Sequence, residues 1–244
     1  MTVCRRCFVA ATGALLLAPA LARSEHRVVV GSGVASKQHL DTPPFTSIAL
    51  GAAFSVELRR GSREGIEIVA DDNLLPLIET KISSRADRTL TIDVAREARI
   101  EPRTPVVVVV DFVNLDALAL GSSGTITGTG LHLEHLAVAV GGSGQMRLPA
   151  LEVATLDVSI GGSGRLTADG HARQLSVSVA GSGRCDLERL VAGAVSVAVV
   201  GSGTVLVNAA TSLSATIAGS GEVHYRGDAT PTLTVVGNGR LKRL

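Results

Sequence analysis

The sequence is poor in aromatic residues and has almost no excess charge of either sign. Its 244 residues include no Trp, one Tyr and four Phe, and the formal net charge is +1. Proteins that stack bases use aromatic faces, and those that bind a phosphate backbone need a basic surface. The composition therefore argues against nucleic acid as a partner and weakens the case for a carbohydrate-processing enzyme.

Cysteine is also scarce. Cys4 and Cys7 lie near the N-terminus, and Cys185 is the only other cysteine. The first two belong to an N-terminal export signal, so their spacing does not indicate a redox or zinc motif. Cys185 follows a glycine-rich turn at a position that is otherwise apolar, which predicts a buried residue and not a nucleophile.

The N-terminal segment has the composition of a secretory signal peptide. Arg5 and Arg6 precede an apolar run over residues 8–21, and residues 20–22 fit a small-x-small cleavage site. The run is too short to span a bilayer comfortably. We therefore expect a signal peptide at residues 1–22, cleaved after Ala22, and export to the periplasm or the cell surface. The general secretory and twin-arginine routes both stay open.

A helical spacing of apolar residues is absent from the second half of the chain, where a glycine-rich tripeptide repeats. Gly-Ser-Gly occupies residues 142–144, 162–164, 181–183, 201–203 and 219–221, with related triplets at 122–124 and 237–239. A period of 18 to 20 residues is typical of a solenoid, in which each repeat is one coil. Sharp turns between strands favour glycine, which adopts positive φ without strain. The glycines that we assign to these turns are Gly124, Gly142, Gly144, Gly162, Gly164, Gly181, Gly183, Gly201, Gly203, Gly219, Gly221, Gly237 and Gly239.

The segments before these turns alternate with a period of two. Leu175, Val177 and Val179 are apolar, whereas Ser176 and Ser178 between them are small and polar, and the same pattern recurs before each turn. Such alternation predicts a strand with one buried and one solvated face. A second short strand is expected after each turn. Parallel connections are overwhelmingly right-handed, so the sequence predicts an all-β protein with a right-handed parallel β-helix.

The stretch before the repeats is less regular. Residues 66–69, 90–94 and 106–110 have the composition of strands, and residues 71–78 predict a short helical turn capped by Asp72 or Asn73, with Pro76 in its first turn. We expect one domain over residues 23–244, with irregular β coils at 23–115 and regular repeats at 116–244.

Residues 69–80, the strand at 90–92, the valine run and the glycine repeats together resemble the putative auto-transporter adhesin, head GIN domain family, also called DUF2807. The resemblance covers roughly residues 44–239. It implies a secreted bacterial β-helix, often in the cell envelope, and it brings no catalytic or ligand-binding residues with it.

Other chemistry finds little support in the sequence. His132, His135 and Glu134, with His171 about two repeats later, are the only arrangement that suggests a metal, and alternation places His132 and Glu134 on the solvated face. We expect no catalytic residues, no metal and no cofactor.

The solvated positions of the repeats form a field of small residues that we expect to be flat, and we regard it as the candidate binding face. Its residues are Ser159, Ser176, Ser178, Ser196, Ser214 and Thr216.

We therefore expect a non-enzymatic binding or structural module, adhesin-like, that contacts a glycan, a wall polymer or an envelope protein. A homodimer through the last coil, where Lys242 and Arg243 lie, is a further expectation. Two alternatives stay open: a glycan-active β-helix hydrolase or lyase, and a periplasmic assembly or sensing partner.

Overall fold

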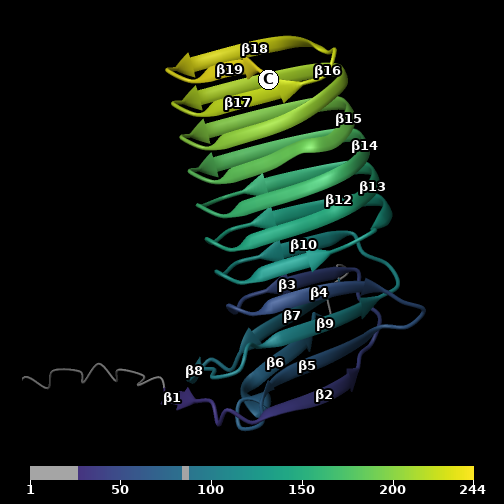
Figure 1. The fold of residues 1–244 in the computed structure, drawn as a ribbon, viewed down its shortest axis with the longest axis vertical. Helices are drawn as coiled ribbons and strands as arrows, with labels where there is room; N and C mark the ends of the chain where they lie inside the picture. The colour runs from purple at the N-terminus through teal and green to yellow at the C-terminus, as the bar shows by residue number, and fades with distance from the viewer. Residues whose placement is uncertain (1–26, 84–87) are drawn as a thin grey trace, which may run out of the picture.

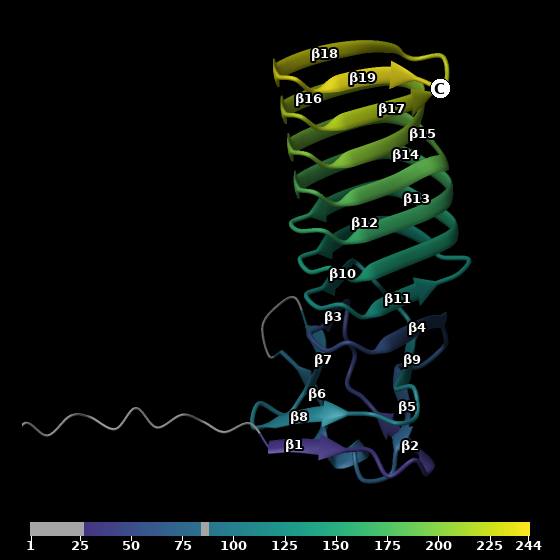
Figure 2. The same cartoon turned by 60° about the vertical axis from the view of Figure 1, so that its left-hand side comes forward.

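The protein is an elongated stack of β coils whose strands run across the long axis (Figures 1 and 2). The structure is a computed structural model, and it describes residues 27–83 and 88–244. The expected signal peptide lies outside the described residues. Each coil has two layers that meet at the glycine-rich turns, here called the corners.

The pre-corner layer contains the strands that run into the corners. From the N-terminal end upward it consists of β7 (Thr89–Val94), β3 (Ser47–Leu50), β10 (Ala117–Leu120), β12 (His132–Val140), the second halves of β13 (Gln145–Ile160), β14 (Arg165–Gly181), β15 (Arg184–Gly201) and β16 (Thr204–Gly219), and then β18 (Thr230–Gly237). All neighbours in this series are parallel.

The post-corner layer contains the strands that leave the corners. It consists of β9 (Val107–Phe112), β4 (Ser55–Arg60), β11 (Thr125–Gly128), the first halves of β13 to β16, β17 (Glu222–Arg226) and β19 (Arg240–Arg243), again all parallel. The predicted parallel β-helix is confirmed.

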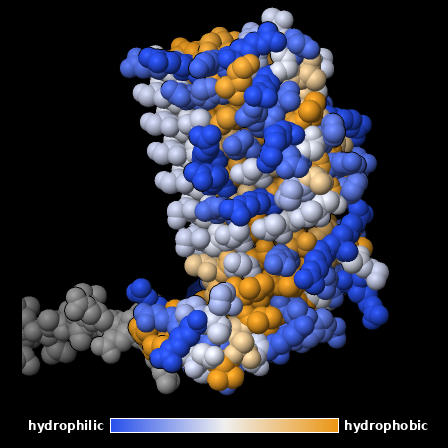
Figure 3. Space-filling model, viewed as in Figure 1, coloured by the Kyte–Doolittle hydropathy of each residue, from blue (hydrophilic) through white to orange (hydrophobic). Residues whose placement is uncertain are grey.

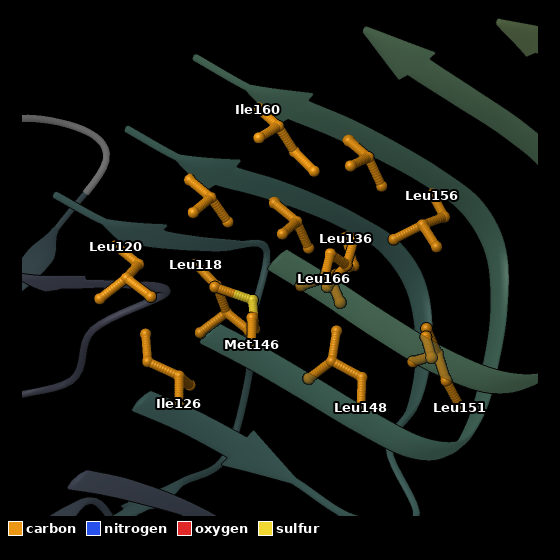
Figure 4. Packing of buried hydrophobic residues seen from close by; sticks show 14 of the residues in the cluster. Leu118, Leu120, Ile126, Leu136, Met146, Leu148, Leu151, Leu156, Ile160 and Leu166 are labelled. Carbon is orange, nitrogen blue, oxygen red and sulfur yellow. The ribbon is translucent and has the colours of Figure 1, made fainter. Parts of the chain in front are cut away.

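Residues of the same kind stack on one another because the coils are in register. In the pre-corner layer, Val158, Val177 and Val197 are aligned on adjacent strands and are each at most 3% exposed. Their side chains meet those of the post-corner layer in the interior, as Figure 4 shows for Leu118 and Leu136 on one side and Ile126 and Met146 on the other. One continuous apolar core therefore runs along the solenoid.

The bend on the side away from the glycine corners is here called the far bend. The sequence predicted that two separate strands would meet there in each coil, and the structure differs. Strands β13 to β16 run without interruption round this far bend (Figure 1). The pairing between β13 and β14 shifts register only between Leu148 and Leu151. A local bulge bends a strand without ending its ladder, so these four strands are each continuous where the sequence predicted two. The strands on either side of the far bend stay separate in β11 and β12 and in β17 and β18, as predicted.

The corner glycines are required for two different physical reasons. Gly181, Gly201, Gly219 and Gly237 have φ between 116° and 124°. Gly144 has no positive φ, but a Cβ on it would lie 2.5 Å from the carbonyl oxygen of Gly124 in the coil below. Positive φ thus explains only part of the set, and close stacking of the corners explains the rest.

The N-terminal end of the solenoid is closed by antiparallel strands. β6 (Ile78–Ile82) pairs antiparallel with β7, and β5 (Gly65–Asp71) pairs antiparallel with β9 and with β2 (Ala35–Asp41). The strands predicted at 66–69, 90–94 and 106–110 are confirmed as β5, β7 and β9. Antiparallel strands thus cover the edges that a further coil would have paired.

Two features of this end depart further from the sequence prediction. The coil formed by β3 and β4 precedes β7 and β9 in the chain but lies between them and β10 and β11. A separate two-stranded sheet pairs β1 (Arg27–Val30) with β8 (Ala98–Glu101). The coils therefore do not follow chain order at this end.

The predicted helical turn exists, but its cap was predicted wrongly. The 3₁₀ helix η1 (Leu75–Leu77) has Pro in its first turn and Leu74 as N-cap, with no side-chain capping bond. Asp72 instead accepts a hydrogen bond from the Ser32 hydroxyl, and the Asn73 amide donates to the carbonyl of Val30. These side chains tie the segment after β1 to the body of the protein.

Two variants of one strand test which of its faces is buried, because each places a charge on a different face. We expect Val177→Asp to destabilise the protein by about 3–5 kcal/mol, because it buries an uncompensated charge, whereas Ser178→Asp is tolerated on the exposed face. Urea unfolding of both variants measures the difference. Equal stability of the two variants would contradict the register.

Because the corners stack closely, adding one methyl group should destabilise the fold at one glycine and leave its stability unchanged at another. Gly201→Ala adds a Cβ 2.7 Å from the carbonyl oxygen of Gly181 at a φ of 117°, and we expect a loss of about 1–3 kcal/mol. Gly161→Ala is the matched control, since no atom lies within 4 Å of its added Cβ. Thermal unfolding of both variants tests the prediction, which fails if the two melt alike.

Candidate functional site

The small residues on the outside of the pre-corner layer form columns along the solenoid axis. In-register pairing aligns each residue with its counterpart on the next coil, and most members are exposed. The first column is Asp157, Ser176, Ser196, Ser214 and Thr232, and the second is Ser159, Ser178, Ala198, Thr216 and Thr234. All six residues of the candidate binding face belong to these two columns.

This face is hollowed, which corrects the expectation of a flat field. A furrow with a volume of about 420 Å³ crosses the coils between the first column and a third column. The third column is Thr155, Gln174, Ala194, Ser212 and Thr230. A hollow of about 240 Å³ on the same layer extends toward the N-terminal end, between alanines of β10 and β12 and Asp157.

The third column lies next to the far bend of each coil. Ala154, Arg173 and Gly193 have no partner in the strand register, although the residues on both sides of them do. The register is the same on both sides of these residues between β13 and β14 and between β14 and β15, and it shifts here only between β15 and β16. The third column begins directly after them in each coil.

The third column was missed in the sequence, although a signal for it is present. Its members each occupy the seventh position before a corner glycine, and they are small or polar in every coil. His135 occupies the same position in the preceding coil. Extending the column analysis by one further outward position would have found the whole wall.

A polar cleft with a volume of about 810 Å³ lies beside the furrow at its N-terminal end. Its charged residues come from four strands and one loop: Arg60, Asp116, His132, Glu134, His135, Glu152 and Arg173. The structure therefore does bring together His132, His135 and Glu134, which the sequence singled out.

Several charged groups of the cleft are paired with one another. His132 Nε2 lies 3.1 Å from Glu152, and its Nδ1 lies 3.0 Å from the carbonyl oxygen of Gly130. Both neighbours can accept a hydrogen bond from the imidazole. Arg173 lies 3.4 Å from Glu134 in the same cleft.

The two glutamates of the cleft are exposed to water and paired. A general acid of that class has a raised pKa, which requires removal from water or a neighbouring like charge. Glu134 and Glu152 are 92% and 61% exposed, and each faces a cationic or protonatable partner. Over residues 27–83 and 88–244, no three His, Cys, Asp or Glu side chains come close enough to hold a metal ion.

The family model for the putative auto-transporter adhesin, head GIN domain (DUF2807) matches residues 44–229. The chain belongs to this family. The resemblance seen in the sequence is thereby confirmed, and membership places the protein among adhesin-like proteins of the envelope or cell surface. No curated protein matches the chain.

Solved structures share the GIN-domain fold. A putative adhesin from Bacteroides fragilis has a TM-score of 0.82 at 21% identity, over 88% of this chain and 100% of that chain. A putative lipid binding protein from Parabacteroides distasonis has a TM-score of 0.73 at 21% identity, over 89% and 100%. A putative adhesin from Parabacteroides merdae has a TM-score of 0.67 at 22% identity, over 89% and 99%. At these identities the similarity shows the fold alone.

In the described part of this GIN-domain chain, no helix has the length and apolar character needed to cross a membrane. Cys185 is buried among apolar residues, and burial raises the pKa of its thiol far above the ordinary value. A thiol held protonated in this way is a poor nucleophile. The expected apolar role of Cys185 agrees with its complete burial.

The one fully buried charged residue among those described is Asp71, and its carboxylate has a structural role. It accepts hydrogen bonds from the backbone N–H groups of Gly33 and Arg103 and from the backbone and hydroxyl of Thr104. Burial alone would raise its pKa, but these bonds outweigh burial and hold the pKa below the ordinary value. The charge of Asp71 therefore joins the segment after β1 to the loop after β8.

The lowered pKa of Asp71 predicts acid sensitivity at the N-terminal end. A carboxyl with a lowered folded-state pKa stabilises the fold above its unfolded value near 3.8, and this contribution is lost as the pH falls through the folded value. We expect Asp71→Asn to lower the melting temperature at pH 7. We also expect the melting temperatures at pH 7 and pH 3 to differ less in this variant than in the wild type. Asp41→Asn, at a fully exposed carboxyl, is the control. An unchanged pH profile in Asp71→Asn would contradict this role.

Proposed function

We propose that this protein is an exported, non-enzymatic binding module of the cell envelope whose furrow receives an extended, uncharged polar ligand. A glycan chain or wall polymer has this character. The observation that supports the proposal is a furrow that crosses the coils and is lined by the same small residues on each of them.

The shape of the furrow favours a linear ligand. The first and third columns, which line it, run along the solenoid axis, so a ligand that follows them meets a similar set of hydroxyl and methyl groups once in every coil. Neighbouring strands are about 4.8 Å apart, which sets the repeat of these contacts. A compact ligand would use only one or two coils and would gain nothing from the repetition.

The chemistry of the furrow favours a ligand without charge. Among the residues that line it, only Asp157 is charged, and it lies 3.9 Å from His135. Hydroxyl groups of Ser176, Ser196 and Ser214 offer both donors and acceptors to a polar ligand. No aromatic residue lines the furrow, so each contact is weak and affinity must accumulate over several coils.

The site of action in this proposal rests on the family and on the N-terminal sequence. Arg5, Arg6 and the apolar run that follows support export, with cleavage after Ala22. An adhesin-like family supports a place in the envelope or at the surface. The proposed role is thus attachment to a polymer outside the cytoplasm.

Binding of the folded protein to an array of glycans, wall polymers and lipid vesicles tests the proposal. We expect saturable binding that strengthens with polymer length, and at least a tenfold loss in the double variant Ser176→Arg, Ser196→Arg, because the long side chains obstruct the furrow. The matched control is Ser182→Arg, Ser202→Arg, which places the same side chains on exposed corner residues.

Three results would contradict the proposal. Equal binding by the furrow variant and the corner variant would remove the furrow from the contact. Binding to vesicles alone would replace the polymer by a lipid. Shortening of the polymer on incubation would show a glycan-active enzyme.

A further inference from the structure

The last coil, formed by β18 and β19, is open on its outer side. In the described part of the chain, β18 pairs only with β16 and β19 only with β17. Leu233 and Val235 occupy inward positions but are 44% and 37% exposed, whereas their partners Ala215 and Ile217 are at most 1% exposed. This coil therefore presents both an unpaired backbone edge and apolar side chains.

At the opposite end of the same solenoid, the outer edge of the first coil is paired with antiparallel strands. There, antiparallel β6 pairs with β7 in one layer and antiparallel β5 pairs with β9 in the other. With those strands in place, Ile92 of β7 and Val110 of β9 are fully buried. A parallel coil of this protein is thus completed by one antiparallel strand on each layer.

We propose that the last coil pairs with the last coil of a second copy of this chain, related by a two-fold axis. A two-fold operation reverses strand order along the solenoid axis and supplies one antiparallel strand to each layer. Each copy then covers Leu233 and Val235 of the other, as β5 and β6 cover the first coil. The inference is independent of the furrow and its ligand.

The charges of the last coil select the orientation of the two copies. β18 contains no charged residue, whereas β19 carries Arg240, Lys242 and Arg243. Pairing β19 with its own symmetry mate would place these cations together, and like charges opposite one another are destabilising. Pairing β18 of one copy with β19 of the other keeps the two cationic strands on opposite layers.

This orientation also brings opposite charges together. Asp228 lies just before β18, is fully exposed, and is 3.5 Å from Arg243 of its own chain. In antiparallel pairing, the end of the second copy's β19 lies beside the start of β18. Asp228 is then shared between two arginines, and the same contact occurs twice in the dimer.

The two furrows open on opposite faces of such a dimer, so it presents two binding sites.

Light scattering after size-exclusion chromatography of residues 23–244 tests the proposal over a concentration series. We expect the mass of two chains at high concentration. The double variant Leu233→Lys, Val235→Lys should have the mass of one chain, because it places charges on the paired edge at positions that are 44% and 37% exposed in the monomer. Val200→Lys is the matched control, since Val200 is 60% exposed on another part of the surface.

A second pair of variants tests the orientation. Asp228→Lys should weaken the dimer at least tenfold, whereas Asp41→Lys, at a fully exposed carboxyl at the other end, should leave it unchanged. Hydrogen exchange should show slower exchange of the β18 amides at high concentration in the wild type and not in the edge variant. A wild-type protein that stays monomeric, or a dimer that survives Leu233→Lys, Val235→Lys, would overturn the proposal.

Discussion

The structure depends on the backbone ladder that joins successive coils. The ladder continues through the corners, where the N–H of Ser202 donates to the carbonyl of Gly181 and the N–H of Thr204 donates to that of Gly183, at 2.9 Å and 3.0 Å. Coils can stay in register only if the corners approach as closely as the strands do. A side chain on Gly201 would prevent this approach, so the corner glycines determine the alignment of everything between them.

Register determines the surface as much as the core. Because each position is repeated on the next coil, the pattern that aligns Val158 with Val177 also aligns Ser159 with Ser178. A charged residue in such a column meets its own kind one strand away, which is unfavourable, whereas serine, threonine and alanine stack without conflict. The small outward residues thus satisfy a stacking constraint, and the furrow is a consequence that a ligand can use.

The sequence predicts the part of the fold that repeats, and it fails where repetition ends. Alternation around Val177 and the glycine triplets gave the strands, the parallel layers and the burial of Cys185 correctly. The position of the coil formed by β3 and β4, ahead of β7 in the chain but above it in space, depends on long-range pairing that no local pattern records. The third column was missed because the alternation was followed only to the fifth position before each corner glycine, and the cap was missed because Ser32, distant in the chain, donates to Asp72.

In a solenoid each interior coil contacts only the coils next to it, so the two ends need their own means of covering an exposed backbone edge. At the N-terminal end, β5 and β6 close both layers, and buried Asp71 joins the flanking segments to them. The last coil keeps the sequence of an interior coil, with Leu233 and Val235 pointing inward, although no strand of the described chain covers them. These exposed side chains are what the proposed second copy would bury, because it supplies one antiparallel strand to each layer of the coil at once.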